Sequence, residues 1–307
     1  MEKQRRYFGD RMKEKKIVTF GCSWTAGDEL DRNEKGDYVY DSSVRDIWSY
    51  GNQLKELLKY DSFENHGISG ASNERIVRCF LNWLNKNKND DSDFLLVFGL
   101  TEYGRRDIWL DVPNKSGFYR MYVINDKEQG WIKDINEKTG LSIGTIKSIN
   151  ETYYTYLYSN YIESYNYFNN VLAIQNLCKL HNIDYVIFSA FTNIPKDNFD
   201  ENQTGDEEAS NVENILPNLE SFIDKKHFFN IDEKYDNMFS VMENIEVATW
   251  WDEEPSPTSD ENNTHFKFSL NKKRNKDLWS SGHHPNRNGH KRIANELFGY
   301  IRENKLI

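Results

Sequence analysis

The sequence has little cysteine and no long apolar run. Its 307 residues include only three cysteines, Cys22, Cys79 and Cys178, and none forms a Cys-x-x-Cys pair. An odd number at wide spacing argues against a disulfide framework and a cysteine zinc site, so we expect a reducing compartment. No apolar run approaches the roughly 18 residues that a membrane-spanning helix needs. Residues 1–16 are charged throughout, without the apolar centre of a secretory signal.

Basic residues are also in short supply. The chain has 39 Lys and Arg against 49 Asp and Glu, which gives a net charge of -10 and a pI near 5.3. Affinity for a phosphate backbone rests largely on Lys and Arg, so we expect no nucleic-acid partner. Hydrophobic residues make up only 37%, but aromatic residues at 14% bury much surface each. The mean hydropathy of -0.83 indicates long polar surface loops around a core of ordinary size.

Buried strands and amphipathic helices alternate along the chain. Continuous apolar runs predict strands at 17–20, 94–98 and 184–189, and a weaker strand lies at 62–65. Apolar periodicity predicts helices at 45–60, at 150–180, from a cap at Ser72 or Asn73 through Leu84, and from Arg287 onward. Such alternation predicts an α/β fold with a mainly parallel sheet covered by helices on both faces.

Two stretches interrupt this alternation. Residues 103–150 contain Trp109, Trp131 and several glycines, which predicts an inserted hairpin or lid. Residues 195–276 are acidic, with prolines among turn residues, and we interpret them as a second surface insertion. The chain is therefore expected to be a single domain over 1–307. A stripe of tyrosines from Tyr154 to Tyr165 at helical spacing favours core packing over a stacking platform for sugars or bases.

Candidate site residues follow the predicted strands. In open parallel sheets, ligands bind beyond the carboxyl ends of the strands. Ser23 follows the first strand, Gly70 follows the second, and Thr101 follows the third. His284 precedes a proline just before the last helix. Serine, glycine and histidine at one sheet edge are the residue types that acyl transfer needs.

These blocks resemble those of the SGNH (GDSL-type) hydrolase family. Residues 21–23 read Gly-Cys-Ser where that family has Gly-Asp-Ser, and residues 65–70 match its glycine block. Residues 99–102 stand in place of Gly-x-Asn-Asp, and residues 281–285 in place of Asp-x-x-His-Pro. The run around Gly-Cys-Ser also resembles phage and bacterial members. The resemblance implies a flavodoxin-like α/β/α sandwich and the hydrolysis of acyl esters.

The resemblance assigns a role to each matching residue. Ser23 is the nucleophile, and His284 is the base that a serine hydroxyl needs at neutral pH. The N–H groups of Ser23 and Gly70 and the Thr101 side chain hold the oxyanion. The plainer alternatives are a helix cap at Ser23 and a turn glycine at Gly70. His283 is a rival base because it precedes His284, and His290 packs or caps within the final helix.

Two positions depart from the family pattern. Thr101 stands where the family has asparagine, and a hydroxyl is shorter than an amide. Ser281 stands where the family has the acid that orients the histidine. Three outcomes stay open: a Ser-His dyad, another carboxylate such as Asp277 or one from an insertion, or a degraded site that only binds. Arg105 or Arg106 adds positive charge nearby, unless these residues are solvated or salt-bridged.

Other chemistries find less support. Asp28, Glu29 and Asp31 lack EF-hand spacing, and the histidines do not form a His-Glu-x-x-His motif. We therefore expect no metal and no cofactor. The predicted function is a serine esterase acting on an acyl ester, with a carbohydrate O-acyl ester preferred because the insertions bring tryptophans. The alternative is a non-catalytic glycan-binding or structural protein of a phage particle, and an acyltransferase would use the same residues. The expected location is the cytoplasm or a virion.

Overall fold

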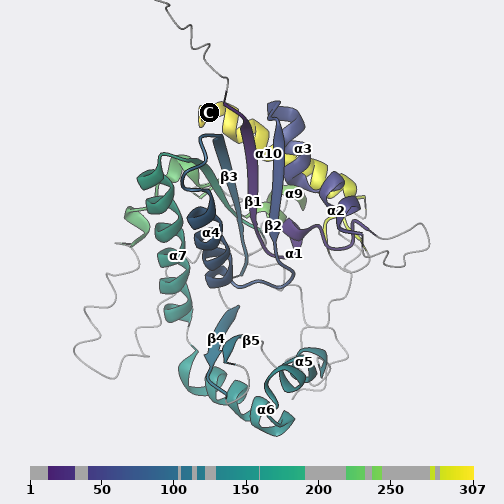
Figure 1. Ribbon diagram of the computed structural model, residues 1–307, viewed down its shortest axis with the longest axis vertical. Helices are drawn as coiled ribbons and strands as arrows, with labels where there is room; N and C mark the ends of the chain where they lie inside the picture. The colour runs from purple at the N-terminus through teal and green to yellow at the C-terminus, as the bar shows by residue number, and fades with distance from the viewer. Residues whose placement is uncertain are drawn as a thin grey trace, which may run out of the picture.

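A four-stranded parallel sheet forms the centre of the protein (Figure 1). The computed structural model describes residues 13–31, 41–102, 105–112, 116–121, 129–158, 160–190, 219–231, 237–243, 277–280 and 284–307. The strands are β1 (Lys15–Gly21), β2 (Ser62–Gly67), β3 (Asp93–Leu100) and β6 (Asp184–Ser189). They pair side by side in the order β2-β1-β3-β6, all parallel. This order places a topological switch point between β1 and β3.

Helices cover both faces of the sheet (Figure 1). One face packs against α4 (Asn73–Asn87) and α7 (Asn160–His181), and the other against α3 (Tyr50–Leu58) and α10 (Arg287–Glu303). Val18 and Phe20 of β1 point into the first core, and Ile17 points into the second, because side chains alternate along a strand. The expected three-layer α/β/α fold with a mainly parallel sheet is confirmed.

The helix predicted over 45–60 is two helices. Helix α2 (Ser42–Trp48) ends at Ser49, and α3 begins at the next residue. Ser49 has extended backbone, and its hydroxyl accepts the N–H of Asn52 while donating to the carbonyl of Asp46. A serine with these contacts ends one helix and caps the other, which apolar periodicity alone does not reveal.

The long helix predicted over 150–180 is also interrupted. Helix α6 (Ile143–Thr152) runs into a π-helical turn, η1 (Tyr153–Leu157), and Tyr158 is extended before α7 begins. The tyrosine stripe is therefore not a single face of one helix. Phe168 packs in the core as expected, but Tyr165 keeps 37% of its surface exposed.

The stretch between β3 and α7 forms a small unit beyond the carboxyl ends of the strands (Figure 1). It consists of the antiparallel hairpin β4 (Arg106–Leu110) and β5 (Gly117–Met121), followed by α5 (Gln129–Thr139) and α6. Its own core contains Tyr119, Ile132, Ile135 and Ile146. We refer to residues 105–152 as the cap.

Part-buried ion pairs join the cap to the main domain. The Asp107 carboxylate, on β4, binds Arg75 at 2.8 Å and also Arg78, both on α4. Arg106 pairs with Glu74 of α4 and lies 3.2 Å from a carboxylate oxygen of Glu163 on α7. The cap is thus held by charge pairs against the two helices that cover one face of the sheet.

Part of the second expected insertion belongs to the core. Within 195–276 the structure describes 219–231 and 237–243, which include η4 (Lys225–His227) and α9 (Met238–Glu243). Phe228 forms a parallel bridge with Ile187 of β6, and Met238 and Phe239 are buried in the core beside α10. These apolar residues belong to the core and not to the surface. The surface insertion expected over 195–276 therefore included residues that are part of the main fold. The remainder of 195–276 lies outside the described residues.

Candidate active site

Three glycines lie at or next to the carboxyl ends of the three adjacent strands β2, β1 and β3. Gly21 of β1 lies in register with Gly67 of β2 and Gly99 of β3. A Cβ at Gly67 would lie 2.5 Å from the carbonyl carbon of Thr25, and one at Gly99 would lie 2.9 Å from the Thr25 hydroxyl. The short helix α1 (Ser23–Ala26) therefore packs directly on the strand ends because glycines lie there.

Ser23 is the first residue of α1 and is largely buried, with 7% of its surface exposed. The N-cap position belongs to Cys22, whose side chain makes no capping bond. Ser23 is thus not the helix cap that the plainer alternative proposed. Burial raises the pKa of the Cys22 thiol, so this neighbour stays protonated and is a poor nucleophile.

Gly70 and Thr101 follow the other two strand ends. Gly70 has a φ of 63°, a left-handed conformation that glycine adopts without strain. Thr101 is clamped by Asn73, which accepts the Thr101 N–H at 2.9 Å and donates to the Thr101 carbonyl at 3.1 Å. The Thr101 hydroxyl is buried and makes no hydrogen bond to any residue in the described ranges. The polar groups expected at this edge thus follow β1, β2 and β3.

His284 lies in a turn that leads into α10. The Ser280 N–H donates to the His284 carbonyl at 2.9 Å, and Trp279 bridges to Pro285. The Trp279 ring packs against Trp24 of α1, with ring centroids 5.2 Å apart. This aromatic contact brings the turn that carries His284 to the helix that carries Ser23.

A carboxylate holds His284, and it comes from the loop after α1. His284 Nδ1 lies 3.2 Å from Glu29 Oε2, and the His284 N–H donates to the same oxygen at 3.4 Å. The Ser280 hydroxyl donates to that oxygen as well. From the sequence, Glu29 was considered only as a metal ligand, and its contact with His284 was missed. The sequence did contain one signal for this contact: Glu29 follows Ser23 closely, at the predicted carboxyl edge of the sheet.

Asp277 was one carboxylate considered as a replacement for the family's acid, and the contact between Glu29 and His284 bears on that alternative. Asp277 is exposed, and its backbone carbonyl accepts the Asn286 side chain. Ser281 and the rival base His283 lie outside the described residues. The carboxylate that binds His284 is therefore Glu29 rather than Asp277.

Ser23 and His284 do not share a hydrogen bond within the described part of the chain. Since Nδ1 faces Glu29, Nε2 is the ring nitrogen left for Ser23. Contacts between nucleophile and base are often long in an unliganded enzyme and shorten when substrate binds.

Both candidate arginines are engaged in ion pairs. Arg106 pairs with Glu74 and Glu163 as described above, and Arg105 pairs with Glu102. The charge of Arg105 acts on Cys22, where it lowers the thiol pKa against the larger effect of burial. Arg105 therefore lies close enough to Cys22 to act on it, and Arg106 anchors the cap.

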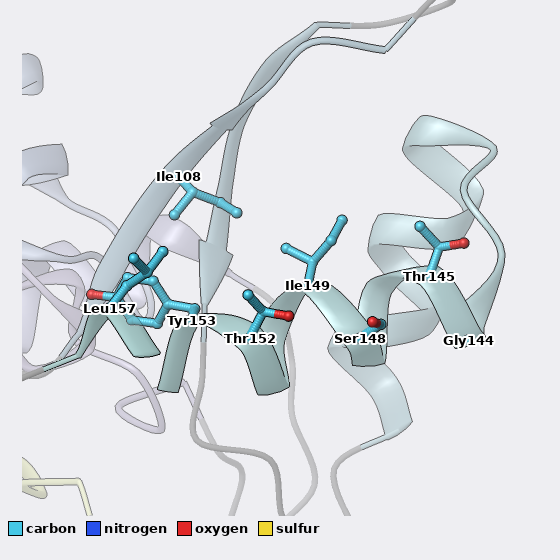
Figure 2. Close-up of a pocket in the computed structure, with 8 residues that line it drawn as sticks. All are labelled: Ile108, Gly144, Thr145, Ser148, Ile149, Thr152, Tyr153 and Leu157. Atoms are coloured by element: carbon cyan, nitrogen blue, oxygen red, sulfur yellow. The ribbon is translucent and has the colours of Figure 1, made fainter. Parts of the chain in front are cut away.

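The cap carries an apolar pocket of about 580 Å³ between β4 and the α6–η1 segment (Figure 2). Ile108 faces Ile149, Tyr153 and Leu157 across it. Neither Ser23 nor His284 lines this pocket. On the hairpin, Trp109 is 57% exposed and packs edge-on against Phe118.

The described residues include neither a cluster of metal ligands nor a membrane-spanning helix. No group of three or more His, Cys, Asp or Glu side chains there is arranged to hold a metal ion. None of the described helices is long and apolar enough to cross a membrane. The three cysteines are all free.

Comparison with known proteins gives structural matches of low similarity. An acetyl xylan esterase is 13% identical, with 93% of this chain and 99% of that chain covered and a TM-score of 0.37. A lipolytic G-D-S-L protein from Veillonella parvula DSM 2008 is 11% identical over 93% and 97%, with a TM-score of 0.36. Phospholipase A1 from Streptomyces albidoflavus NA297 is 11% identical over 95% and 99%, with a TM-score of 0.35. At these values the likeness carries no conclusion about activity.

Comparison of the sequence alone is more decisive. No curated protein matches it. One family model, described as a family of unknown function, matches residues 28–241. Because this match spans most of the chain, the protein belongs to that family, DUF6071.

Proposed function

We propose that the protein is a serine esterase of SGNH type. Ser23 is the nucleophile, His284 is the base, and the N–H groups of Ser23 and Gly70 with the Thr101 hydroxyl hold the oxyanion. The observation that supports this proposal most is the bond between His284 and a buried carboxylate at the sheet edge that carries Ser23. A histidine with one nitrogen bound in this way presents the other as a base.

The proposed reaction proceeds in two steps. The Ser23 oxygen attacks the ester carbonyl carbon while His284 takes the hydroxyl proton. The tetrahedral intermediate collapses, its C–O bond to the alcohol breaks, and His284 returns the proton to the leaving alcohol. A water molecule then attacks the acyl-enzyme with His284 as base, which releases the carboxylic acid and restores Ser23. No step requires a metal or a redox partner.

Thr101 is the weakest of the proposed oxyanion donors. Its hydroxyl has no partner among the described residues, so it is available to donate, but it is fully buried. Removing one oxyanion donor typically lowers turnover about 100- to 1000-fold. We expect Thr101→Val to slow hydrolysis by less than this, because the two proposed backbone donors, the N–H groups of Ser23 and Gly70, stay in place.

The preferred substrate is an O-acyl ester on a carbohydrate. The cap lies beyond the strand ends and exposes Trp109 and Phe118 on its hairpin. Exposed aromatic faces suit the apolar faces of sugar rings, and a small acyl group such as acetyl suits a nucleophile that is 7% exposed.

The proposal is tested by activity-based labelling. A fluorophosphonate probe should label the wild type and fail to label Ser23→Ala. Ser92→Ala is the control, because Ser92 precedes β3 at the opposite edge of the sheet and binds Asp90. Hydrolysis of p-nitrophenyl acetate and of acetylated sugars should follow the same pattern. A wild type that neither labels nor cleaves these esters would refute an esterase.

A binding protein is the second candidate. Two observations favour it: Ser23 and His284 share no hydrogen bond in the described residues, and the Thr101 hydroxyl is buried. This function, as a glycan-binding or structural phage protein, predicts that the folded wild type is unlabelled yet binds acetylated oligosaccharides. Calorimetry with such oligosaccharides distinguishes it from the esterase.

A further inference from the structure

The loop after α1 is built around Glu29. Glu29 itself has a φ of 72°, which a side chain other than glycine seldom adopts, and Gly27 before it has a φ of 74°. The side chain of Glu29 is only 1% exposed. A strained backbone together with a buried carboxylate is costly unless the charge is well satisfied.

Contacts on both sides of Glu29 hold the loop in place. The Asp28 N–H donates to the Ser23 carbonyl at 3.0 Å. The carboxylates of Asp28 and Asp31 both pair with Arg45 of α2, at 3.0 Å and 2.9 Å. The backbone and charge contacts thus fix the loop relative to the nucleophile turn.

Three donors to Glu29 come from the turn that carries His284. They are the His284 ring, the His284 N–H and the Ser280 hydroxyl, and all three meet the same carboxylate oxygen. Bonds to ring and backbone of one residue fix its tautomer and its orientation together. The serine at 281, where a carboxylate was expected, leaves this role open for Glu29.

We propose that Glu29 is the positioning residue that orients His284 and stabilises its protonated ring, a role that rests on the esterase function proposed above. The triad is then Ser23, His284 and Glu29, with the acid supplied by the loop behind the nucleophile instead of the turn before the histidine. Glu29 does not touch the substrate. It holds the proton on Nδ1, so that Nε2 is free to accept the proton of Ser23.

The test compares two glutamates that each bind a histidine. Glu29→Gln keeps the shape of the side chain but removes its charge. Glu64→Gln is the matched control, because Glu64 Oε2 lies 3.1 Å from His66 Nε2 on β2. For p-nitrophenyl acetate we expect Glu29→Gln to lower kcat about 10³- to 10⁴-fold with KM changed little, by analogy with triad acids. Glu64→Gln should retain the wild-type kcat, and Glu29→Asp, which keeps the charge, should recover part of the loss.

Nitrogen NMR of His284 gives an independent readout. With the ring signals assigned by their loss in His284→Ala, the wild type should carry its proton on Nδ1 at neutral pH. Glu29→Gln should admit the other tautomer, because the glutamine amide nitrogen donates to Nδ1. A wild-type ring protonated on Nε2 would overturn the assignment of Glu29, even if Glu29→Gln fails to fold.

The two proposals fail in different ways. If the wild type hydrolyses esters and Glu29→Gln keeps activity within about tenfold of Glu64→Gln, the role of Glu29 is refuted and the esterase stands. If the wild type is inactive and unlabelled, the esterase is refuted. In that case, a proton on Nδ1 would still support the part of the Glu29 proposal that concerns the orientation of the His284 ring. A proton on Nε2 would refute that part too.

Discussion

His290 is completely buried at the start of α10, and acid should unfold the protein through it. Its Nδ1 accepts the backbone N–H of Tyr50 at 3.0 Å, and the two rings stack with centroids 6.0 Å apart. Its Nε2 has no hydrogen-bond partner in the described residues. Burial, with a smaller contribution from His284, lowers the pKa of His290 from 6.5 to about 3. The folded protein therefore keeps this ring neutral.

The sign of the pH dependence follows from proton binding. The unfolded chain protonates this histidine near pH 6.5, whereas the folded protein holds its pKa at about 3. Between these values the unfolded state binds one more proton, so the free energy of unfolding falls as the pH falls. The slope for one proton is about 1.4 kcal/mol per pH unit. His290 thus has no effect above pH 6.5 and removes roughly 4 kcal/mol by pH 3, a large share of a typical stability of about 5–15 kcal/mol.

Urea unfolding followed by tryptophan fluorescence, between about pH 7.5 and 5, measures this slope. His290→Asn is the informative variant, because the Asn side-chain oxygen can still accept the Tyr50 N–H while the titrating ring is gone. It should be less stable at neutral pH by about 1–3 kcal/mol through the cavity left behind. Its stability should then fall less steeply with acid, by about 1.4 kcal/mol per pH unit.

The control is His66→Asn, the same substitution at a histidine that is partly exposed on β2. Carboxylates also titrate in this range, so the difference between variants carries the test rather than any single slope. Equal slopes for wild type and His290→Asn would contradict the reasoning. So would an NMR titration in which His290 of the folded protein gains a proton near pH 6.5.

Three substitutions test the packing around the site. Gly67→Ala should destabilise the protein by about 1–3 kcal/mol and reduce fluorophosphonate labelling, because the added Cβ would press on the backbone of Thr25 and Ala26. Thermal unfolding measures the first effect, and the labelling assay measures the second. Tyr50→Phe removes the buried bond of 2.9 Å between the Tyr50 and Thr25 hydroxyls and should cost about 1 kcal/mol in urea unfolding. Asp107→Asn should lower the free energy of unfolding by about 1 kcal/mol, a modest loss because the two arginine partners of Asp107 are partly exposed. It should also speed hydrogen exchange in the β4–β5 hairpin.

The sequence is most informative where one local rule dominates. A continuous apolar run identified β3, since a central parallel strand is buried on both faces. Ser72 or Asn73 was predicted as the cap of the next helix, and the Ser72 hydroxyl does accept the Arg75 N–H. Placing chemistry beyond the strand ends brought Ser23, Gly70 and Thr101 to neighbouring strands. Each of these predictions depends on the residue types within one short segment of the chain.

The sequence is least informative where two local signals compete. Apolar periodicity continued through Ser49 and Tyr158, yet the backbone is extended at both. Ser49 has a capping hydroxyl and therefore interrupts the helix. At Tyr158 the aromatic rings of Tyr153 and Tyr154 pack against its ring, so clustering of side chains replaces helical stacking. Periodicity records which residues are apolar, not where the backbone must turn.

The proposed acid was missed for a different reason, which also bears on how the proposed site assembles. Glu29 and His284 are 255 residues apart, so no spacing rule links them, and the family pattern points to Ser281 instead. Glu29, in contrast, follows Ser23 closely in the chain, and the Asp28 N–H next to Glu29 donates to the Ser23 carbonyl. The proposed nucleophile and the proposed acid are therefore placed relative to each other by local structure, and only the histidine comes from a distant part of the chain. The site is complete only when the turn before α10 docks through Trp279 on Trp24, so its formation depends on folding of the whole domain.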